Sequence, residues 1–200
     1  DHVHVLAADL MDMDALPGLV QSAWNIHGGI DLAIFNAGIA QWGTVASSTQ
    51  PVDDHVLDLN YRSPAACIKA LLPKMQQVEH GSIAAISSIA GLFGQANLAA
   101  YSASKAALIL YMESLKEEVH NSPIRVHVIS PGVIRTGIMS RGLNEQGAIM
   151  SERSQSGNSG IPTAIASQRI VTFLASRRFH LILASPVERL GLFLHHCCPR

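Results

Sequence analysis

The sequence predicts an α/β fold with a doubly wound parallel sheet, in which helices cover both faces. Short apolar runs typical of buried strands alternate along the chain with longer segments of helical apolar spacing, and this alternation indicates a parallel sheet. The chain has 200 residues and is 48% hydrophobic, which is enough for one domain with a hydrophobic core. We therefore expect a single domain over residues 1–200, without internal repeats.

The expected strands and helices follow one another in turn. Strands are expected at residues 2–7, 31–35, 82–87, 124–129 and 179–183. Helices are expected at residues 13–27, 51–77 with an interruption at 60–64, 99–120, 162–176 and 187–196. Between residues 137 and 160 the chain is polar and rich in glycine and serine, which is typical of a mobile loop. The chain thus divides into a core at 1–136, this loop, and a C-terminal helix, strand and helix at 161–200.

The composition argues against several classes of function. The formal net charge is −1 and the chain has no basic block, so nucleic acid is not the expected partner. No apolar run reaches the length of a membrane span. Cys67 stands alone, whereas Cys197 and Cys198 are adjacent, so no disulfide framework is expected. This cysteine usage favours a reducing compartment, and we expect the protein to be cytoplasmic.

Histidines near the C-terminus could form a metal site with the adjacent cysteines, because imidazole and thiolate are both zinc ligands. The candidates are His180, His195 and His196. Neighbouring ligands on one short terminal segment lack the paired spacing of zinc sites, so no metal is expected.

The stretch Tyr101-Ser-Ala-Ser-Lys105 carries the clearest chemistry. Its tyrosine and lysine are four residues apart in a segment of helical spacing, so both side chains lie on one helix face. An ammonium beside a phenol favours the phenolate and lowers the phenol pKa toward the range useful for acid-base work. Ser88, at the end of an apolar strand, could donate to the same substrate oxygen. The set predicts carbonyl or alcohol chemistry, although such a pair also occurs by chance in structural helices.

Further motifs stand in a fixed order around this pair. Phe35-Asn-Ala-Gly38 follows one apolar strand, Asn60 ends the stretch Leu-Asp-Leu-Asn, and Ser130-Pro-Gly-Val-Ile-Arg-Thr136 follows another strand. With these motifs, the segment from about Asp9 to Thr136 resembles the short-chain dehydrogenase/reductase family. The resemblance implies a Rossmann-like fold and an oxidoreductase that uses NAD or NADP on a small-molecule carbonyl or alcohol.

The resemblance assigns catalytic roles to four residues. It implies that Tyr101 is the catalytic acid or base, and that Lys105 lowers the phenol pKa and binds the nicotinamide ribose, so that both also belong to the cofactor site. It places Ser88, rather than its neighbour Ser87, on the substrate oxygen. It places Asn60 at a helix distortion that holds a water in a proton relay, with a plain helix amide facing solvent as the alternative.

The resemblance also implies further cofactor contacts. The turn Asn36-Ala37-Gly38 corresponds to a segment on the adenine-ribose side, where small residues allow close backbone approach. Asp9 corresponds to an acid that contacts the adenine amino group, with an ordinary acid after a strand as the alternative. The loop that holds the nicotinamide carboxamide and the pyrophosphate corresponds to Pro131, Gly132, Ile134 and Thr136. The loop at 137–160 corresponds to the family's substrate lid, with a plain disordered connection as the alternative. Two positions, Phe35 and His127, hold other residues where the family commonly has asparagine, and the role of His127 stays open.

One family motif has no counterpart in the chain, the glycine-rich Thr-Gly-x-x-x-Gly-x-Gly turn. Gly28-Gly29 precedes a strand pattern, whereas a phosphate cradle must open into a helix N-terminus. The resemblance therefore implies a truncated copy or fragment that starts at the family's third strand. Because the family sheet has the order 3-2-1-4-5-6-7, the strand at 2–7 would stay unpaired or pair with the strand at 31–35.

We therefore expect an enzyme that transfers a hydride between NAD(P)(H) and a carbonyl or alcohol. The alternative is a catalytically inactive fragment that acts as an interaction module, because the diphosphate turn is absent. Serine hydrolysis fits poorly, since no Gly-x-Ser-x-Gly elbow surrounds Ser88. The helices at about 60–77 and 101–120 correspond to the family's usual dimer surface, so a homo-oligomer is expected by analogy.

Overall fold

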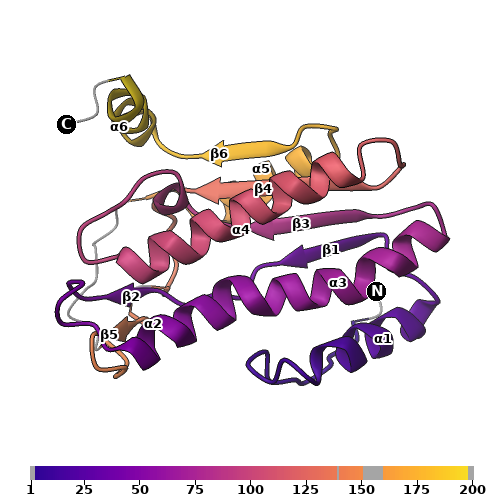
Figure 1. Cartoon of the computed structure of the whole chain (residues 1–200). Coiled ribbons are helices and arrows are strands. Elements are labelled where there is room, and N and C mark those ends of the chain that lie inside the picture. The colour runs from indigo at the N-terminus through magenta and orange to yellow at the C-terminus, as the bar shows by residue number, and fades with distance from the viewer. Residues whose placement is uncertain (1–2, 139, 151–159, 198–200) are drawn as a thin grey trace.

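The computed structural model of the chain describes residues 3–138, 140–150 and 160–197. Four parallel strands form the main sheet in the order β1-β3-β4-β6 (Figure 1). Their bounds are Leu32–Phe35 for β1, Ser82–Ile86 for β3, Arg125–Pro131 for β4 and His180–Leu183 for β6. Because the strands run in one direction, their carboxyl ends meet at one edge. The predicted α/β class with a parallel sheet is confirmed.

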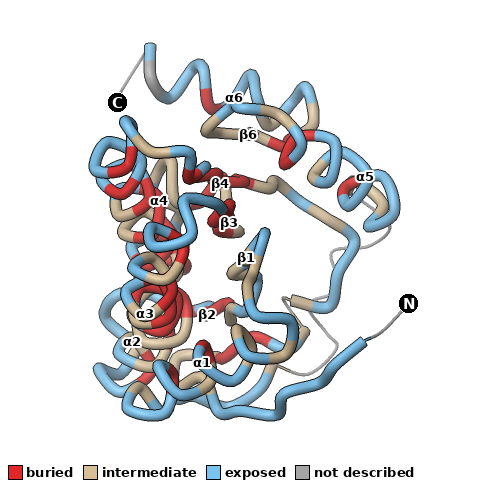
Figure 2. The backbone as a smooth tube through the Cα atoms, turned by 90° about the vertical axis from the view of Figure 1, so that its right-hand side faces the viewer, coloured by how far each residue is buried: buried red, intermediate tan, exposed pale blue. Residues whose placement is uncertain are grey.

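Helices cover both faces of this sheet. Helices α3 and α4 lie on one face and α5 lies on the other (Figure 2), while α1 packs against α3. The helices span Leu16–His27 (α1), Gln50–Leu57 (α2), Ser63–Gln77 (α3), Ala99–Glu118 (α4), Thr163–Leu174 (α5) and Pro186–Cys197 (α6). No helix in the described part of the chain is both long enough and apolar enough to cross a membrane.

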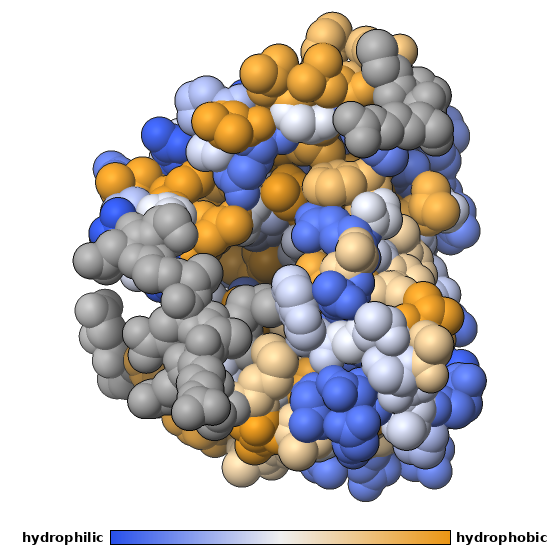
Figure 3. Space-filling model, turned by 90° about the vertical axis from the view of Figure 1, so that its left-hand side faces the viewer, coloured by the Kyte–Doolittle hydropathy of each residue, from blue (hydrophilic) through white to orange (hydrophobic). Residues whose placement is uncertain are grey.

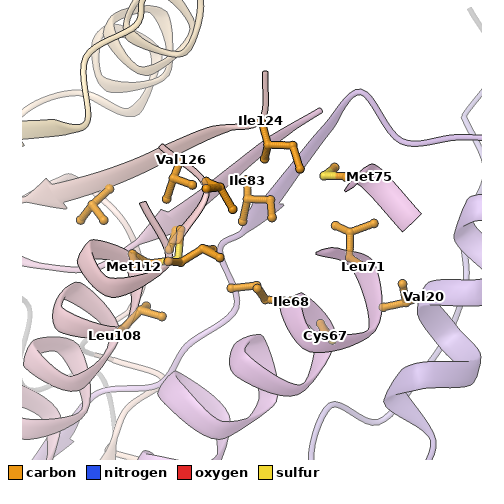
Figure 4. Close-up of a cluster of buried hydrophobic side chains, with 14 of the residues drawn as sticks. Val20, Cys67, Ile68, Leu71, Met75, Ile83, Leu108, Met112, Ile124 and Val126 are labelled. Atoms are coloured by element: carbon orange, nitrogen blue, oxygen red, sulfur yellow. The ribbon is translucent and has the colours of Figure 1, made fainter. Parts of the chain in front are cut away.

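The main hydrophobic core lies between α3, α4 and the sheet (Figure 4). Ile68 and Leu71 of α3 and Met112 of α4 are at most 1% exposed and pack with Ile83 and Val126 of the central strands. Dense packing of this kind allows little movement of α4 against β3 and β4. The core therefore fixes the helix that carries Tyr101 and Lys105 against the strand that leads to Ser88.

The first expected strand does not form. Residues 3–9 have no regular structure, and Val3 and Val5 are 86% and 85% exposed. This segment also does not pair with β1, which remains the edge strand of the sheet, with Leu32 and Ile34 exposed. The alternating pattern of residues 2–7 favours a strand, but a strand needs a neighbour to satisfy its backbone hydrogen bonds, and no strand among the described residues pairs with this segment.

The structure differs in detail from the expectations for two other segments. The interruption expected at 60–64 is a π-helical turn over Asp58–Arg62, which joins α2 to α3 without a break. Part of the loop expected at 137–160 is a hairpin, in which the Asn144 N–H donates to the Ala148 carbonyl at 2.8 Å. One arm of it forms a short parallel pair, β2 (Gln41–Trp42) with β5 (Leu143–Asn144), beyond the carboxyl edge of the sheet. Residues 151–159 of the expected loop lie outside the described residues.

Candidate active site

Ser88 and Tyr101 meet at the carboxyl edge of the sheet. Ser88 follows β3 in extended conformation and caps a 3₁₀ turn, where its Oγ accepts the Ala90 N–H at 3.1 Å. Tyr101 lies in the first turn of α4, and its phenol lies near enough to the Ser88 side chain for Ser88 to lower the phenol pKa. Both residues are half-buried.

Lys105 lies one helical turn after Tyr101 and is only 3% exposed. Its Nζ lies 5.9 Å from the centre of the Tyr101 ring and donates to the Ile86 carbonyl at 2.9 Å. The Ser87 hydroxyl donates to the Lys105 carbonyl at 2.9 Å, which ties the end of β3 to α4. The two adjacent serines therefore differ: Ser87 joins two elements, while Ser88 faces the Tyr101 hydroxyl.

Asn60 lies in the π-helical turn and is fully buried. Its Oδ1 accepts the Ile39 N–H at 2.8 Å, and its Nδ2 donates to the Ile39 carbonyl and to Ser104 Oγ, each at 3.0 Å. A solvent-facing helix amide is therefore excluded. The helix distortion that the resemblance implied is present at this position.

Ser104 is a site residue that the sequence analysis missed. Its hydroxyl accepts from Asn60 and donates to the Tyr101 carbonyl at 2.8 Å, so it joins the π-helical turn to α4. Its position three residues after Tyr101 was the available signal, because a serine in a helix commonly donates to the carbonyl three or four residues earlier.

Gly38 brings the end of β1 close to these groups. A Cβ at this position would lie 3.0 Å from Asn60 Oδ1 and 3.2 Å from Lys105 Nζ. Most side chains larger than glycine would therefore crowd the ammonium and the amide. The turn Asn36-Ala37-Gly38 thus forms one wall of the site.

Burial shifts the pKa values of Tyr101 and Lys105. Burial raises the pKa of the Tyr101 phenol, and the hydrogen bond with Ser88 only partly offsets this effect. Burial also lowers the pKa of the Lys105 ammonium to about 8. The net direction is therefore opposite to the lowered Tyr101 pKa that the sequence led us to expect, because loss of hydration on burial outweighs the effect of Ser88.

The cofactor residues expected from the sequence fall into two groups. Asn36 and Ala37 line a pocket of about 270 Å³ together with Leu10. Asp9, next to Leu10, is exposed, and its carboxylate accepts the Met11 N–H at 2.9 Å. The second group begins with Pro131, the last residue of β4, and continues in the following loop with Gly132, Ile134 and Thr136.

The turn after β1 and the loop after β4 both lie at the carboxyl edge of the sheet. Figure 3 views the molecule from the side to which the strands point and shows hydrophobic side chains around a central hollow. At the reaction end of this edge, Gly38 lets the backbone after β1 approach the Asn60 amide and the Lys105 ammonium closely. At the diphosphate end the sequence has no glycine-rich turn that could supply free amides to a phosphate.

His127 belongs to the core and not to this site. It is 1% exposed, its Nδ1 lies 2.8 Å from the Arg178 carbonyl oxygen, and its ring packs edge-on against Phe173. Within residues 3–138, 140–150 and 160–197, no group of three or more His, Cys, Asp or Glu side chains could hold a metal ion.

Comparisons with known proteins agree with this geometry. A family model described as "short chain dehydrogenase" matches residues 1–147. The chain is 34% identical over 195 residues to a "Dehydrogenase/reductase SDR family protein 7-like" from Anopheles gambiae. That match covers 98% of this chain and 62% of the relative, so the chain spans less than two thirds of that protein's length.

Solved structures share the fold. A short-chain dehydrogenase from Streptomyces avermitilis matches with a TM-score of 0.79 and 27% identity, over 96% of this chain and 74% of that one. A short-chain dehydrogenase/reductase from Burkholderia phymatum, solved in complex with NAD, matches with a TM-score of 0.77 and 21% identity, at the same coverage. At 21% identity, the second likeness shows the fold alone.

Proposed function

The chain belongs to the short-chain dehydrogenase family, and from this premise we propose that it forms the catalytic part of an oxidoreductase that uses NAD or NADP on a carbonyl or alcohol. A bound nicotinamide supplies or accepts the hydride. The observation that carries the proposal is the grouping of Tyr101 and Ser88 with two buried side chains, Lys105, whose ammonium lies 5.9 Å from the Tyr101 ring, and Asn60.

Each residue has a separate task in this proposal. Tyr101 gives a proton to the substrate oxygen in reduction, or takes it in oxidation, and Ser88 donates a hydrogen bond to the same oxygen. The raised Tyr101 pKa favours the neutral phenol, which is the form that donates the proton in reduction. Lys105, whose Nζ lies 5.9 Å from the centre of the Tyr101 ring, places positive charge near the phenolate that forms when the proton is given.

Asn60 is proposed to act in a proton relay, while other residues bind the cofactor. Asn60 fixes the Ile39 backbone and reaches Ser104, and we propose that it orders a water between Lys105 and solvent. The residues proposed to bind the cofactor are Asp9, Asn36, Ala37, Gly38, Tyr101, Lys105, Pro131, Gly132, Ile134 and Thr136.

A substitution that removes the Tyr101 hydroxyl tests the function. In the protein that carries this chain, Tyr101→Phe should lower carbonyl-dependent NADH or NADPH oxidation at least about a hundredfold, because the proton donor is lost. The fold should remain, as judged by circular dichroism and thermal unfolding. Tyr111→Phe is the matched control, because Tyr111 lies on the same helix but packs against Tyr61, away from Ser88. Activity retained by Tyr101→Phe would contradict the assignment.

A second reading is that the 200-residue chain alone is inactive and serves as an interaction module, because it has no diphosphate turn. Titration with NADH and NADPH, followed by fluorescence, separates the two readings. Micromolar binding supports the enzyme. Absence of binding, in a chain that unfolds cooperatively, supports the inactive module.

We further propose a homo-oligomer built on the outer surfaces of α3 and α4, where a groove of about 560 Å³ lies between the two helices. For the compartment, Cys67 and Cys197 are free thiols, which favours a reducing environment such as the cytoplasm.

A further inference from the structure

Helix α6 packs against the turn that carries the proposed catalytic serine. Its Leu192 is 7% exposed and belongs to a cluster with Ile89, the residue after Ser88. The His195 ring lies 5.5 Å from the Phe93 ring, which belongs to the same segment after β3. The position of α6 is therefore tied to one wall of the site.

Glu188 ties the same helix to the loop after β4. Its Oε2 accepts the Ser185 N–H at 2.7 Å, while the Glu188 N–H donates to Ser185 Oγ at 3.3 Å. These two bonds form a capping box at the start of α6. The second carboxylate oxygen, Oε1, accepts the Val133 N–H at 2.7 Å, so one side chain caps its own helix and holds another loop.

The backbone of Val133 is held on both sides. Its N–H is bound by Glu188, and its carbonyl accepts the Ile161 N–H at 2.9 Å. The preceding residue must be small, because a Cβ on Gly132 would overlap the Glu188 carboxylate. The next amide, the N–H of Ile134, donates to no residue in the part of the chain that the structure describes.

The charge on Glu188 agrees with this role. Burial raises the pKa of its carboxyl, but hydrogen bonds from Ser185 and Val133 outweigh that effect and lower the pKa. The carboxylate is therefore the form that the site favours, and bonds from amides to a carboxylate are stronger than bonds between neutral groups.

We propose that Glu188 is a positioning residue, which fixes Val133 so that the Ile134 amide stays available to the carboxamide of a nicotinamide cofactor. Helix α6 thereby couples the Ser88 turn to the cofactor loop. The inference rests on the proposed function, because it takes the loop after β4 as the nicotinamide site. A carboxylate at this position was detectable in the sequence, since Ser185-Pro-Val-Glu188 before an apolar run is a capping-box pattern.

Three variants test the role. Glu188→Ala removes the cap and the bond to Val133, Glu188→Gln keeps one acceptor oxygen, and Ser185→Ala weakens only the cap of α6. We expect Glu188→Ala to speed hydrogen exchange of the Val133 amide and to raise the Kd for NADH about tenfold, as the loss of a charged hydrogen bond predicts. Glu188→Gln should restore part of the affinity. Ser185→Ala should leave both readouts near those of the wild type.

Two results would overturn the inference. One is a Val133 exchange rate unchanged by Glu188→Ala, a measurement that requires no cofactor. The other is NADH affinity lost equally in Ser185→Ala and Glu188→Ala, since destabilisation of α6 would then explain both. A wild-type protein that does not bind NADH overturns the proposed function instead, and the exchange rate still decides whether Glu188 anchors the loop.

Discussion

Burial of the Lys105 ammonium makes the stability of the fold depend on pH. In the folded chain the pKa of this group is about 8, compared with an ordinary value of 10.5. Between these values the unfolded chain binds more protons than the folded chain, so the free energy of unfolding rises with pH. Below about pH 8 the folded chain bears the full free-energy cost of burying the charged ammonium. Above this pH the group loses its proton in the folded chain, and the cost falls.

The predicted rise can be measured by urea unfolding. Between about pH 8 and about pH 9.5, we expect wild-type stability to increase by up to about 2 kcal/mol from this group. Lys105→Met should remove this increase, because its side chain does not titrate. The control is Lys69→Met, since Lys69 is exposed on α3. If Lys105→Met and Lys69→Met show the same slope of unfolding free energy against pH, that slope does not come from Lys105.

At the scale of elements, the 3₁₀ turn after Ser88 packs directly on the backbone of α4. A Cβ on Gly91 would lie 2.7 Å from the Lys105 carbonyl carbon and 2.9 Å from the Ala106 nitrogen. These are backbone atoms, which cannot rotate away as a flexible side chain can. Glycine at this position therefore sets the separation between the turn that carries Ser88 and the helix that carries Tyr101.

Gly91→Ala tests this packing. We expect a loss of stability of about 1 to 3 kcal/mol, the usual cost of overpacking, together with a fall in turnover, because the two hydroxyls move apart. Gly94→Ala is a control in the same loop, where a Cβ would meet nothing within 4 Å. Denaturant unfolding and turnover should separate the two variants. Equal behaviour would show that the close approach at Gly91 does not control the site.

The sequence predicted the elements with several periodic apolar residues, and it failed where structure depends on distant partners. Strands β2 and β5 have two residues each, too few for a period, and they pair because Leu143 N–H reaches the Ala40 carbonyl at 2.8 Å. The π-helical turn has no signature in composition. The segment 2–7 alternates as a strand does, but pairing depends on a neighbour that no local pattern reveals.

The site shows the same division. Helical spacing predicted that Tyr101 and Lys105 share one helix face, and the order of the family motifs predicted that Ser88 and Asn60 belong to the same site. Spacing could not predict that the Tyr101 pKa is raised, because the direction depends on burial of the phenol in the folded chain.

At the scale of the whole molecule, the groove between α3 and α4 is the strongest candidate for association between copies. Leu110 is 62% exposed there, beside partly buried Leu72 and Tyr111. An exposed apolar groove on two long helices is stabilised when a second copy covers it. The residues proposed for catalysis come from one chain, so association would support the fold of each site and not complete it.

A charge in this groove should separate the copies. We expect the wild type to sediment as a dimer and Leu110→Glu to sediment as a monomer, because the new carboxylate would be buried beside Glu118, which also lines the groove. Val171→Glu is the control, since Val171 is 68% exposed on α5, on the opposite face of the sheet. A wild-type monomer, or a dimer that survives Leu110→Glu, would exclude this surface as the interface. If each chain contains a complete site, turnover per chain in Leu110→Glu should stay within about threefold of the wild type. Activity measured at the protein concentration used for sedimentation checks this.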